Sequence, residues 1–383
     1  MKYFDIRDVF RQYPGMTMYF VFGERSNGKT YSCLDYAIEI YAKEQAQTVY
    51  LRRSREDVRS HISGNLLSAH MKNKRFEHWF KDMELPWNAV RFTGSALYPQ
   101  HHWFSDKGVL KKKTAETPMI LTAALSTWDH TKGISFPDVK FIMFDEFLTT
   151  GLYLPGEVNI FQNVLSSFIR ERDDVKVVLL GNTVDKYSPY FSELGLKHIS
   201  DMKPGDAQVY ESGDKKAKYL VMLTPKAGEK KSDAYFSVFD NATSAMIRGG
   251  LWEMSAYPII PDGLSPKTIK PTYIFFISFA EKLVRCNMIL LNQQVYFTCH
   301  GWNRKYVVND DGTRTEMGRN YIIYTDYMSL NPSDRYNMLN QHGDRVAKLF
   351  REAVSEGRIY FSNNETGDLV SNYYRWCNQT SIL

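Results

Sequence analysis

Cysteine is scarce in this chain of 383 residues. The four cysteines are Cys33, Cys286, Cys299 and Cys377, and no two of them form a C-x-x-C pair. No group of cysteines and histidines has the spacing of a zinc site. A zinc-finger module and a disulfide scaffold are therefore excluded. Scattered cysteines of this kind are typical of a reduced, cytoplasmic protein.

Long hydrophobic runs are missing as well. The longest candidates, TYIFFISFA and CNMILLNQQVYF, have the length of strands, whereas a helix that spans a bilayer needs about 20 apolar residues. The first residues, MKYFDIRDVFRQYPG, lack the apolar core of a signal peptide. We therefore expect a protein of the cytoplasm without a membrane partner. The chain also has no internal repeat and no low-complexity tract.

Apolar residues are plentiful by comparison. Hydrophobic residues make up 43% of the chain and charged residues 24%, which is the composition of a globular protein. The length exceeds that of one ordinary core and indicates more than one domain. The net charge of +5 permits a polyanionic partner but does not require one.

Strand and helix patterns alternate between Met18 and Asn182. Short apolar runs such as MYFVFG, TVYLRRS, VKFIMFDEF and VKVVLLGNT are separated by amphipathic segments such as KTYSCLDYAIEIYAKEQ. This alternation predicts an α/β domain with a doubly wound, mostly parallel sheet at 1–200. The segment 201–265 is polar and contains glycine and proline, which indicates a connector between the two domains.

The sequence from 266 to 383 has a different pattern. YIFFISFA, CNMILLNQQVYFTC, RKYVVND and NYIIYTD read as consecutive antiparallel strands. DRVAKLFREAVSEG reads as a helix and RIYFSN as a further short strand. We therefore expect an α+β domain at the C-terminal end.

One loop carries a phosphate-binding signature. In FVFGERSNGKTYS, the residues Gly23, Gly28, Lys29 and Thr30 fit G-x-x-x-x-G-K-[ST] between a predicted strand and a predicted helix. Backbone N–H groups of such a loop surround phosphate oxygens, and the helix N-terminus adds positive charge. A coincidental surface turn is the alternative. The predicted nucleotide-binding residues are Gly23, Glu24, Arg25, Ser26, Asn27, Gly28, Lys29, Thr30 and Tyr31.

An acidic pair follows the strand FIMFDEF. Lys29 would reach the β- and γ-phosphates of ATP, and Thr30 with Asp145 would hold Mg²⁺. Glu146 would orient the attacking water as a base. This indicates ATP hydrolysis, because a switch GTPase more often uses Gln and no guanine-reading N-K-x-D occurs where it is expected. An acidic pair can also serve as a helix N-cap or begin a loop.

Polar residues near the ends of the next elements are further candidates. Asn182 ends the strand VVLLGN, where it can sense the γ-phosphate or serve as a turn residue. Arg170 and Arg172, in FIRERDD, are candidates for an arginine finger supplied by a neighbouring subunit. An arginine at a helix C-terminus is more often a partner of the helix dipole.

Other basic residues lie in loops and turns. Arg25, inside the glycine loop, can contact phosphate or pair with Glu24 or Glu146. The candidates for contact with DNA phosphates are Arg52, Arg53 and Arg55 in YLRRSRED and Lys111, Lys112 and Lys113 in the predicted hairpin GVLKKKT. For each of these groups, a solvated turn is the alternative.

Taken together, these stretches resemble the DNA-packaging (encapsidation) ATPases of small tailed phages with protein-primed linear genomes, which are large-terminase-like motors. The resemblance rests on FVFGERSNGKTY, TVYLRRSRE, LSTWDHTKGISFPDVKFIMFDEF, LPGEVNIFQNVLSSFIRER and LLGNTVDKYSPYF. It covers the N-terminal half well. It implies a P-loop ATPase domain of the additional-strand, catalytic-glutamate type.

The resemblance also implies roles for single residues. Lys29 and Thr30 bind nucleotide and Mg²⁺, and Asp145 and Glu146 form the acidic pair. The finger acting in trans is Arg170 rather than Arg172, and Asn182 is the sensor. Lys132 makes a second trans contact to the neighbour's nucleotide, and Arg55 faces the pore.

The family implies partners as well. Its members form a homo-oligomeric ring, here expected to have five subunits, on the phage portal (connector) of the prohead, and the ring grips double-stranded DNA. In some members an RNA scaffold links the ring to the prohead. The implied location is the host cytoplasm and, transiently, the prohead, but not the mature virion.

The C-terminal segment 266–383 resembles a ribonuclease-H-type domain, matched by the order of its elements more than by its residues. An active nuclease needs clustered carboxylates for two metal ions, and YIFFISFA carries none. Asp310, Asp311, Asp326 and Asp334 fall at predicted strand ends or loops. We therefore expect an inactive nuclease relic that binds but does not cut.

The function that the sequence favours is ATP-driven translocation of double-stranded DNA into a prohead. Three alternatives remain open. They are another ring-forming translocase or helicase, a packaging terminase with an active nuclease, and an assembly protein that binds nucleotide only for stability.

Overall fold

The structure is a computed structural model of the chain, and it forms two compact units, Met1–Glu253 and Met254–Leu383. The residues that the structure describes are 3–62, 65–84, 86–127, 135–149, 153–154, 156–183, 188–196, 198–212, 216–226, 257–265, 268–280, 282–304, 306–308, 314–316 and 321–380.

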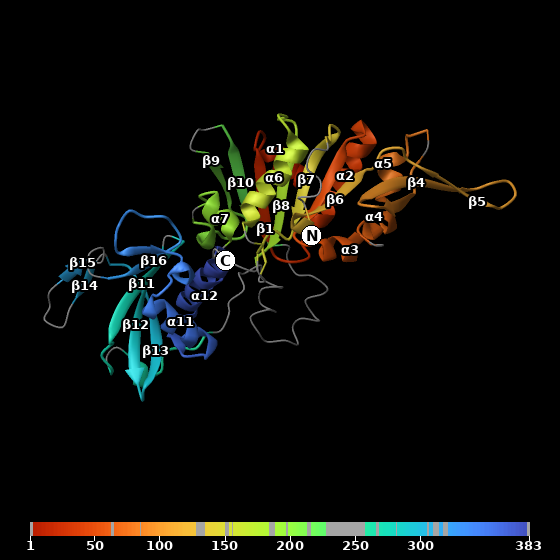
Figure 1. The fold of residues 1–383 in the computed structure, drawn as a ribbon. Coiled ribbons are helices and arrows are strands. Elements are labelled where there is room, and N and C mark those ends of the chain that lie inside the picture. Colours follow the sequence, from red (N-terminus) through yellow and green to blue (C-terminus); the bar gives the residue numbers. More distant parts are fainter. Residues whose placement is uncertain are drawn as a thin grey trace. The chain divides into compact units, whose positions relative to one another are not determined.

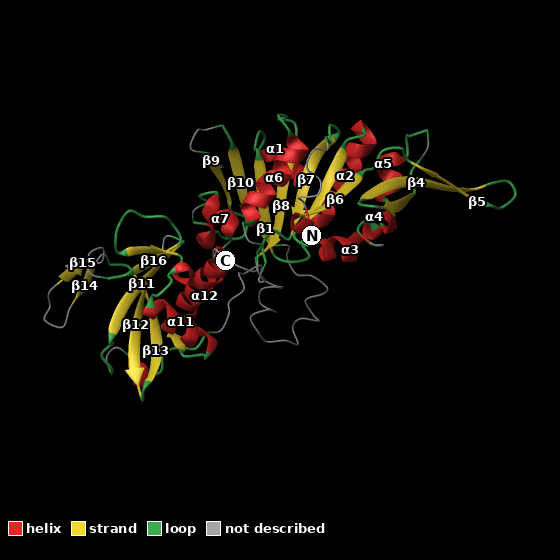
Figure 2. Ribbon diagram, in the orientation of Figure 1, coloured by secondary structure: helices red, strands yellow, loops and turns green. Residues whose placement is uncertain are grey.

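A large, mostly parallel sheet organises the first unit (Figures 1 and 2). Its strands are β1 (Met18–Gly23), β2 (Gln47–Arg52), β3 (Ala89–Thr93), β4 (Ala96–Phe104), β5 (Leu110–Thr114), β6 (Ile120–Ala124), β7 (Val139–Asp145), β8 (Lys176–Asn182), β9 (Ala207–Glu211) and β10 (Lys218–Leu223). Neighbouring strands follow the order β3-β4-β6-β2-β7-β8-β1-β10-β9, and β5 pairs with β4. The run from β6 to β10 is parallel throughout, which confirms the predicted mixed α/β architecture.

Helices pack on the faces of this sheet. They are α1 (Ile6–Gln12), α2 (Lys29–Glu44), α3 (Arg55–Ile62), α4 (Ser68–Lys72), α5 (Arg75–Phe80), α6 (Glu157–Ile169) and α7 (Pro189–Glu193). Apolar residues of α1, α2 and α5 form one core with the sheet, and those of α6 and α7 form another. Because successive side chains of a strand point to opposite faces, Tyr19 and Val21 enter the first core and Phe20 and Phe22 the second.

Strands β9 and β10 are a difference from the sequence-based expectation. The segment 201–265 was expected to be a connector, yet β10 pairs with β1 in parallel, from Met18 opposite Tyr219 to Phe22 opposite Leu223. β9 then pairs with β10 in antiparallel fashion and ends the sheet. The first part of the expected connector therefore belongs to the first unit.

The predicted hairpin around GVLKKKT is confirmed. β4 and β5 pair in antiparallel fashion from Gln100 opposite Thr114 to Phe104 opposite Leu110. The hairpin projects beyond the rest of the sheet (Figure 1), and its distal residues Phe104 and Val109 are well exposed.

The second unit has a mixed sheet of its own. Its strands are β11 (Tyr273–Phe279), β12 (Lys282–Leu291), β13 (Gln294–Trp302), β16 (Ile323–Thr325), β17 (Asp334–Tyr336) and β18 (Ile359–Phe361), beside a small ladder of β14 (Tyr306–Val308) and β15 (Arg314–Glu316). The helices are α11 (Arg345–Ser355) and α12 (Asn364–Thr380). The sheet order is β17-β16-β11-β12-β13-β18.

Two details of this unit correct the sequence-based prediction. CNMILLNQQVYFTC was expected to be one strand, but the chain turns at Asn292 and Gln293, which both have positive φ, and pairs β12 with β13. Two consecutive residues with positive φ are typical of a type I′ turn, which usually contains glycine. The strand predicted in NYIIYTD, β16, pairs with β11 in parallel rather than in antiparallel fashion. β17 and β18 are also parallel to the strands they pair with.

Among the described residues, none of the helices has the length and hydrophobicity needed to span a membrane.

Candidate functional site

The loop between β1 and α2 has the backbone of a tight cradle. Gly23 ends β1 at φ 155°, and Gly28 precedes α2 at φ 93°. A Cβ added at Gly23 would lie 2.0 Å from Thr224 Oγ1. A side chain at Gly23 is therefore excluded by contact with Thr224, the residue directly after β10, as well as by backbone conformation.

Lys29 lies across this loop. Its ammonium group donates hydrogen bonds to the Glu24 carbonyl at 2.7 Å and to Asn27 Oδ1 at 3.2 Å, and it lies 3.5 Å from Asn182 Oδ1. In the parallel register, Asn182 is opposite Gly23. The structure thus brings Asn182 next to the predicted loop, although it lies 153 residues from Lys29 in the sequence.

Thr30 and Asp145 meet at the carboxyl ends of the strands. The Thr30 hydroxyl donates a hydrogen bond to Asp145 Oδ1 at 3.0 Å, and the Tyr50 hydroxyl donates to Oδ2 at 3.2 Å. Burial raises the pKa of the Asp145 carboxyl, and the neighbouring Arg52 guanidinium opposes part of this effect. A hydroxyl beside a carboxylate is an oxygen donor set of the kind that Mg²⁺ prefers.

Glu146 lies next to this pair in an uncommon backbone conformation, with φ 61°. Its side chain is more than half exposed and forms an ion pair with Arg52, with 2.8 Å between Oε2 and Nη2. Arg52 also lies 3.5 Å from Asp145 Oδ2 and is itself buried. A carboxylate at the rim of the site, held by one arginine, is accessible to water.

Arg53 occupies a different environment from the one expected. It forms a buried ion pair with Glu157, at 2.8 Å, and donates hydrogen bonds to the carbonyls of Glu146 and Phe147. Glu157 also accepts from the Tyr190 hydroxyl at 3.0 Å. These contacts occupy the Arg53 guanidinium inside the first unit, where it holds β2, the end of β7 and the start of α6 together rather than facing a DNA backbone.

The two arginines after α6, Arg170 and Arg172, have different environments. Arg172 donates hydrogen bonds to main-chain carbonyls, including those of Pro137, Val139 and Phe168. Arg170 is exposed, with φ 37°, at the end of the helix. Of the two, Arg170 is the one exposed to solvent. Lys132 lies outside the described residues.

The other basic candidates lie at the surface. Arg25 and Ser26 are exposed in the loop, whereas Glu24 and Asn27 are buried. Arg55 is exposed at the start of α3. Lys111, Lys112 and Lys113 are exposed on β5.

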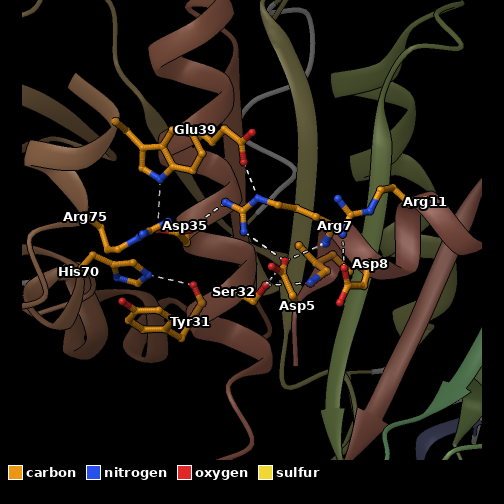
Figure 3. Close-up of polar contacts among 12 residues, drawn as sticks. Asp5, Arg7, Asp8, Arg11, Tyr31, Ser32, Asp35, Glu39, His70 and Arg75 are labelled. Carbon is orange, nitrogen blue, oxygen red and sulfur yellow. Dashed lines mark hydrogen bonds and ion pairs between the residues drawn. The ribbon is translucent and has the colours of Figure 1, made fainter. Parts of the chain in front are cut away.

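A polar cluster beside the loop was not predicted from the sequence (Figure 3). Asp35, on α2, accepts hydrogen bonds from Arg7 at 2.8 Å and from Arg75 at 2.6 and 2.7 Å. Burial alone would raise the pKa of Asp35, but the two guanidinium groups hold it below its usual value. A carboxylate on the buried face of an amphipathic helix was the signal that could have revealed this cluster.

Two of the four aspartates considered in the sequence of the second unit, Asp326 and Asp334, lie among the described residues. Asp326 accepts a hydrogen bond from the Ala280 backbone N–H, and burial raises its pKa. Asp334 lies on β17, and Asp310 and Asp311 lie outside the described residues. Among the described residues, no group of three or more His, Cys, Asp or Glu side chains has the arrangement of a metal site.

Comparison with known proteins gives a consistent result. Residues 111–212 match a family model described as Podovirus DNA encapsidation protein (Gp16). The chain is 27% identical over 175 residues to the DNA packaging protein of Bacillus phage phi29, which covers 45% of this chain and 44% of that protein. The match thus spans less than half the length of this curated relative.

Two solved structures resemble the whole fold. The Phi-28 gp11 DNA packaging motor aligns with a TM-score of 0.53 at 16% identity, over 100% of this chain and 99% of that one. The bacteriophage Phi-29 viral genome packaging motor assembly also gives 0.53, at 18% identity, over 98% and 99%. At these identities the likeness concerns the fold.

Proposed function

We propose that this chain is the ATP-hydrolysing subunit of a motor that moves double-stranded DNA into a phage prohead. The observation that carries the proposal is the convergence of Lys29, Thr30, Asp145 and Asn182 at the carboxyl ends of β1, β7 and β8. The match to DNA packaging proteins supports the choice of substrate.

The residues of the loop fit ATP with Mg²⁺. The loop 23–31 would surround the phosphates with backbone N–H groups, and Lys29 would exchange its present carbonyl partners for β- and γ-phosphate oxygens. Thr30 and Asp145 would hold the cation, directly or through its water. Bound Mg²⁺ neutralises charge that develops on the transferring phosphoryl group.

Glu146 would take the proton of the attacking water. Its carboxylate is exposed and is held by Arg52, so the orientation of the base depends on that ion pair. Asn182, 3.5 Å from the Lys29 ammonium, would register whether a γ-phosphate is bound. Arg25, exposed in the loop, would supply a second positive charge to the same phosphate.

The remaining roles concern a ring of five copies of this chain on the portal of the prohead. Arg170 of one copy would complete the site of its neighbour, and Lys132 would make a second contact there. Arg55 and the lysines at 111–113 would contact DNA phosphates, so binding would be independent of sequence and steeply dependent on salt. A packaging RNA is a further partner of the ring in this proposal. The ring itself would be located in the host cytoplasm and, during packaging, on the prohead surface.

The second unit would be an RNase-H-like nuclease relic. Its mixed sheet, with three antiparallel strands followed by parallel additions, supports this assignment.

The test is DNA-stimulated ATP hydrolysis by single variants. Glu146→Gln is expected to lower kcat by about 10²–10⁴-fold with ATP binding retained. Lys29→Ala is expected to lower both kcat and the affinity for ATP. Glu77→Gln, at an exposed position on α5, is the matched control and should leave hydrolysis unchanged. Intact hydrolysis in both Lys29→Ala and Glu146→Gln would refute the site.

The position of Arg170 is tested by mixing subunits. Arg170→Ala and Glu146→Gln subunits are each expected to be inactive alone. The Arg170→Ala subunit retains Glu146, and the Glu146→Gln subunit retains Arg170. In a mixed ring, some interfaces combine these two intact residues, so part of the activity should return. No recovery at any ratio would contradict a finger acting in trans.

A further inference from the structure

Arg172 lies two residues beyond Arg170, after the end of α6, and its side chain is 25% exposed. Its guanidinium group donates five hydrogen bonds, all of them to main-chain carbonyls. The acceptors are Phe136 at 3.1 Å, Pro137 at 2.7 Å, Val139 at 2.8 Å, Phe168 at 2.7 Å and Ile169 at 3.1 Å. A guanidinium group has five N–H donors, so each donor of Arg172 has an acceptor.

These hydrogen bonds join the end of α6 to the segment that leads into β7. Phe168 and Ile169 belong to the last turn of α6, where carbonyls have no partner within the helix and a positive charge is favourable. Pro137 precedes β7, and Val139 is its first residue. The rings of Phe136 and Phe168 pack between the same two segments, with 4.5 Å between centroids. The turn after α6 is therefore held against the start of β7.

The turn itself has an uncommon backbone. Arg170 and Glu171 both have positive φ, at 37° and 50°, a region that glycine enters freely and other residues enter at a cost. Many helices end with one such residue, usually glycine, but here two follow each other and neither is glycine. A conformation of this kind persists only where its surroundings determine it. The five hydrogen bonds of Arg172 supply that constraint.

The position of this turn bears on what Arg170 can reach. Arg172 contacts Val139 at the beginning of β7, whereas Asp145 is the last residue of the same strand. The strand rises about 20 Å between these two residues. The turn therefore lies near the opposite end of β7 from the Thr30–Asp145 pair, which favours action of Arg170 on a second copy of the chain.

We propose that Arg172 is a positioning residue for the arginine finger. It holds Arg170 and Glu171 in the conformation that presents Arg170 to a neighbouring copy, and its own donors stay on main-chain carbonyls. The inference rests on the proposed function, because it requires Arg170 to act in trans. Lysine has three donors on a flexible stem and glutamine has two on its amide, so neither can replace the five fixed donors of Arg172.

DNA-stimulated ATP hydrolysis by the full-length chain tests this with Arg172→Lys and Arg172→Gln. Both variants are expected to lower kcat by about tenfold to a hundredfold, as displacement of a catalytic group does, and to keep the KM for ATP within about twofold. Arg11→Lys is the matched control, because Arg11 lies in the last turn of α1 with a 76% exposed side chain, and it should leave both constants unchanged.

Mixed rings distinguish a finger-positioning role from a general structural one. Arg172→Lys subunits retain Glu146, and Glu146→Gln subunits retain both Arg170 and Arg172. Adding Glu146→Gln subunits should therefore raise the activity above that of the same amount of Arg172→Lys subunits alone. A residue that only maintained the site of its own chain would give no rise at any ratio, and that result would overturn the inference.

Three further results would also overturn it. They are unchanged kcat in both Arg172 variants, loss of ATP binding in both by titration calorimetry, and a loss of kcat as large as that of Arg170→Ala, which would make Arg172 the finger itself. Arg170→Ala separates this failure from that of the proposed function. If Arg170→Ala is inactive while both Arg172 variants keep their kcat, only the positioning role fails. Full activity of Arg170→Ala would refute the proposed finger.

Discussion

Arg52 and Arg53 are neighbours in the sequence, yet they lie in different parts of the site. Arg52 reaches the Glu146 carboxylate, and Arg53 reaches Glu157 on α6. Arg52 is the last residue of β2, and Arg53 is the first residue after it. Arg52 is therefore placed to affect Glu146, the proposed catalytic base, and Arg53 maintains the framework around it.

We expect Glu157→Gln to lower the free energy of unfolding by about 3–5 kcal/mol, because it leaves the buried Arg53 charge without a counter-ion. Denaturant unfolding of the full chain measures this loss. The control is Glu77→Gln, which removes an exposed ion pair with Lys74 at 3.8 Å and should cost less than about 1 kcal/mol. Equal losses in the two variants would contradict a structural role for the buried pair.

His70 should make stability depend on pH. Burial lowers its pKa below the usual value near 6.5, with Asp35 acting in the opposite direction and Arg75 adding to the decrease. Below about pH 6.5 the unfolded chain therefore binds a proton that folded His70 does not. This contribution to stability is complete at neutral pH and is lost as the pH falls towards the folded-state pKa.

Melting temperatures of the unchanged chain and of His70→Gln, measured between pH 7.5 and pH 5.5, isolate the effect. As the pH falls, the melting temperature of the unchanged chain should decrease more than that of His70→Gln. The difference should be about 2–4 °C for each kcal/mol of stability that is linked to protonation of His70. Identical pH profiles would show that His70 does not titrate differently in the folded state.

At the scale of elements, the loop 23–31 depends on a strand that comes about two hundred residues later. Asn27 Nδ2 donates to Thr224 Oγ1 at 2.7 Å, and the same oxygen excludes any side chain at Gly23. Thr224, directly after β10, therefore helps to fix the shape of the loop.

Gly23→Ala should lower both stability and nucleotide affinity, because its methyl group would overlap Thr224 Oγ1. Thr224→Ala alone removes a partner of Asn27 and should cost about 1–3 kcal/mol. In the double variant part of the loss should be recovered, with a coupling of at least about 0.5 kcal/mol. Calorimetric melting of all four chains gives this coupling, and strictly additive losses would rule out the contact.

The β4–β5 hairpin presents two unlike faces. Lys111 is opposite Trp103 and Lys113 is opposite His101, so these four side chains share one face, whereas Lys112 shares the other face with His102. A DNA backbone lying along the hairpin would meet one of the faces at a time.

We expect Lys111→Gln with Lys113→Gln to flatten the dependence of log K on log salt by up to about 1.8, which corresponds to two phosphate contacts. Lys112→Gln, a change of the same chemistry on the other face, should alter the slope much less. Fluorescence anisotropy with duplex DNA at several salt concentrations measures the slopes. A larger change for Lys112→Gln would reverse the assignment of the binding face.

At the scale of the whole molecule, two units with separate sheets should unfold in separate steps. ATP with Mg²⁺ at a hundred times its Kd should stabilise only the first unit, by about 2.7 kcal/mol. Scanning calorimetry with and without nucleotide tests this, with Lys29→Ala as the control that should show no shift. An equal shift of both transitions would place nucleotide contacts in the second unit as well.

The sequence allowed accurate prediction where a pattern is contiguous. The strand, loop and helix around Lys29, the strand that ends at Asp145 and the helix α11 needed only neighbouring residues. Their hydrophobic periodicity and their glycines determine the local structure directly.

Contacts between residues that are distant in the sequence were harder to predict. β10 has polar neighbours and reads as a connector, and nothing in its own residues indicates that it pairs with β1. The environments of Arg52 and Arg53 could not be separated either, because their difference depends on the positions of Glu146 and Glu157 in three dimensions. The turn at Asn292 and Gln293 lacks the glycine that usually signals it.

The parallel pairing of β10 with β1 also has a mechanical meaning. A force that pulls the chain beyond Thr224 along the axis of β10 would load the β1–β10 hydrogen bonds in shear, so that they resist together rather than opening one after another. The hydrogen bond from Asn27 to Thr224 lies at the end of β10 to which that tension is applied. Tension on the chain at this point would thus act on the loop 23–31 through the Asn27 side chain.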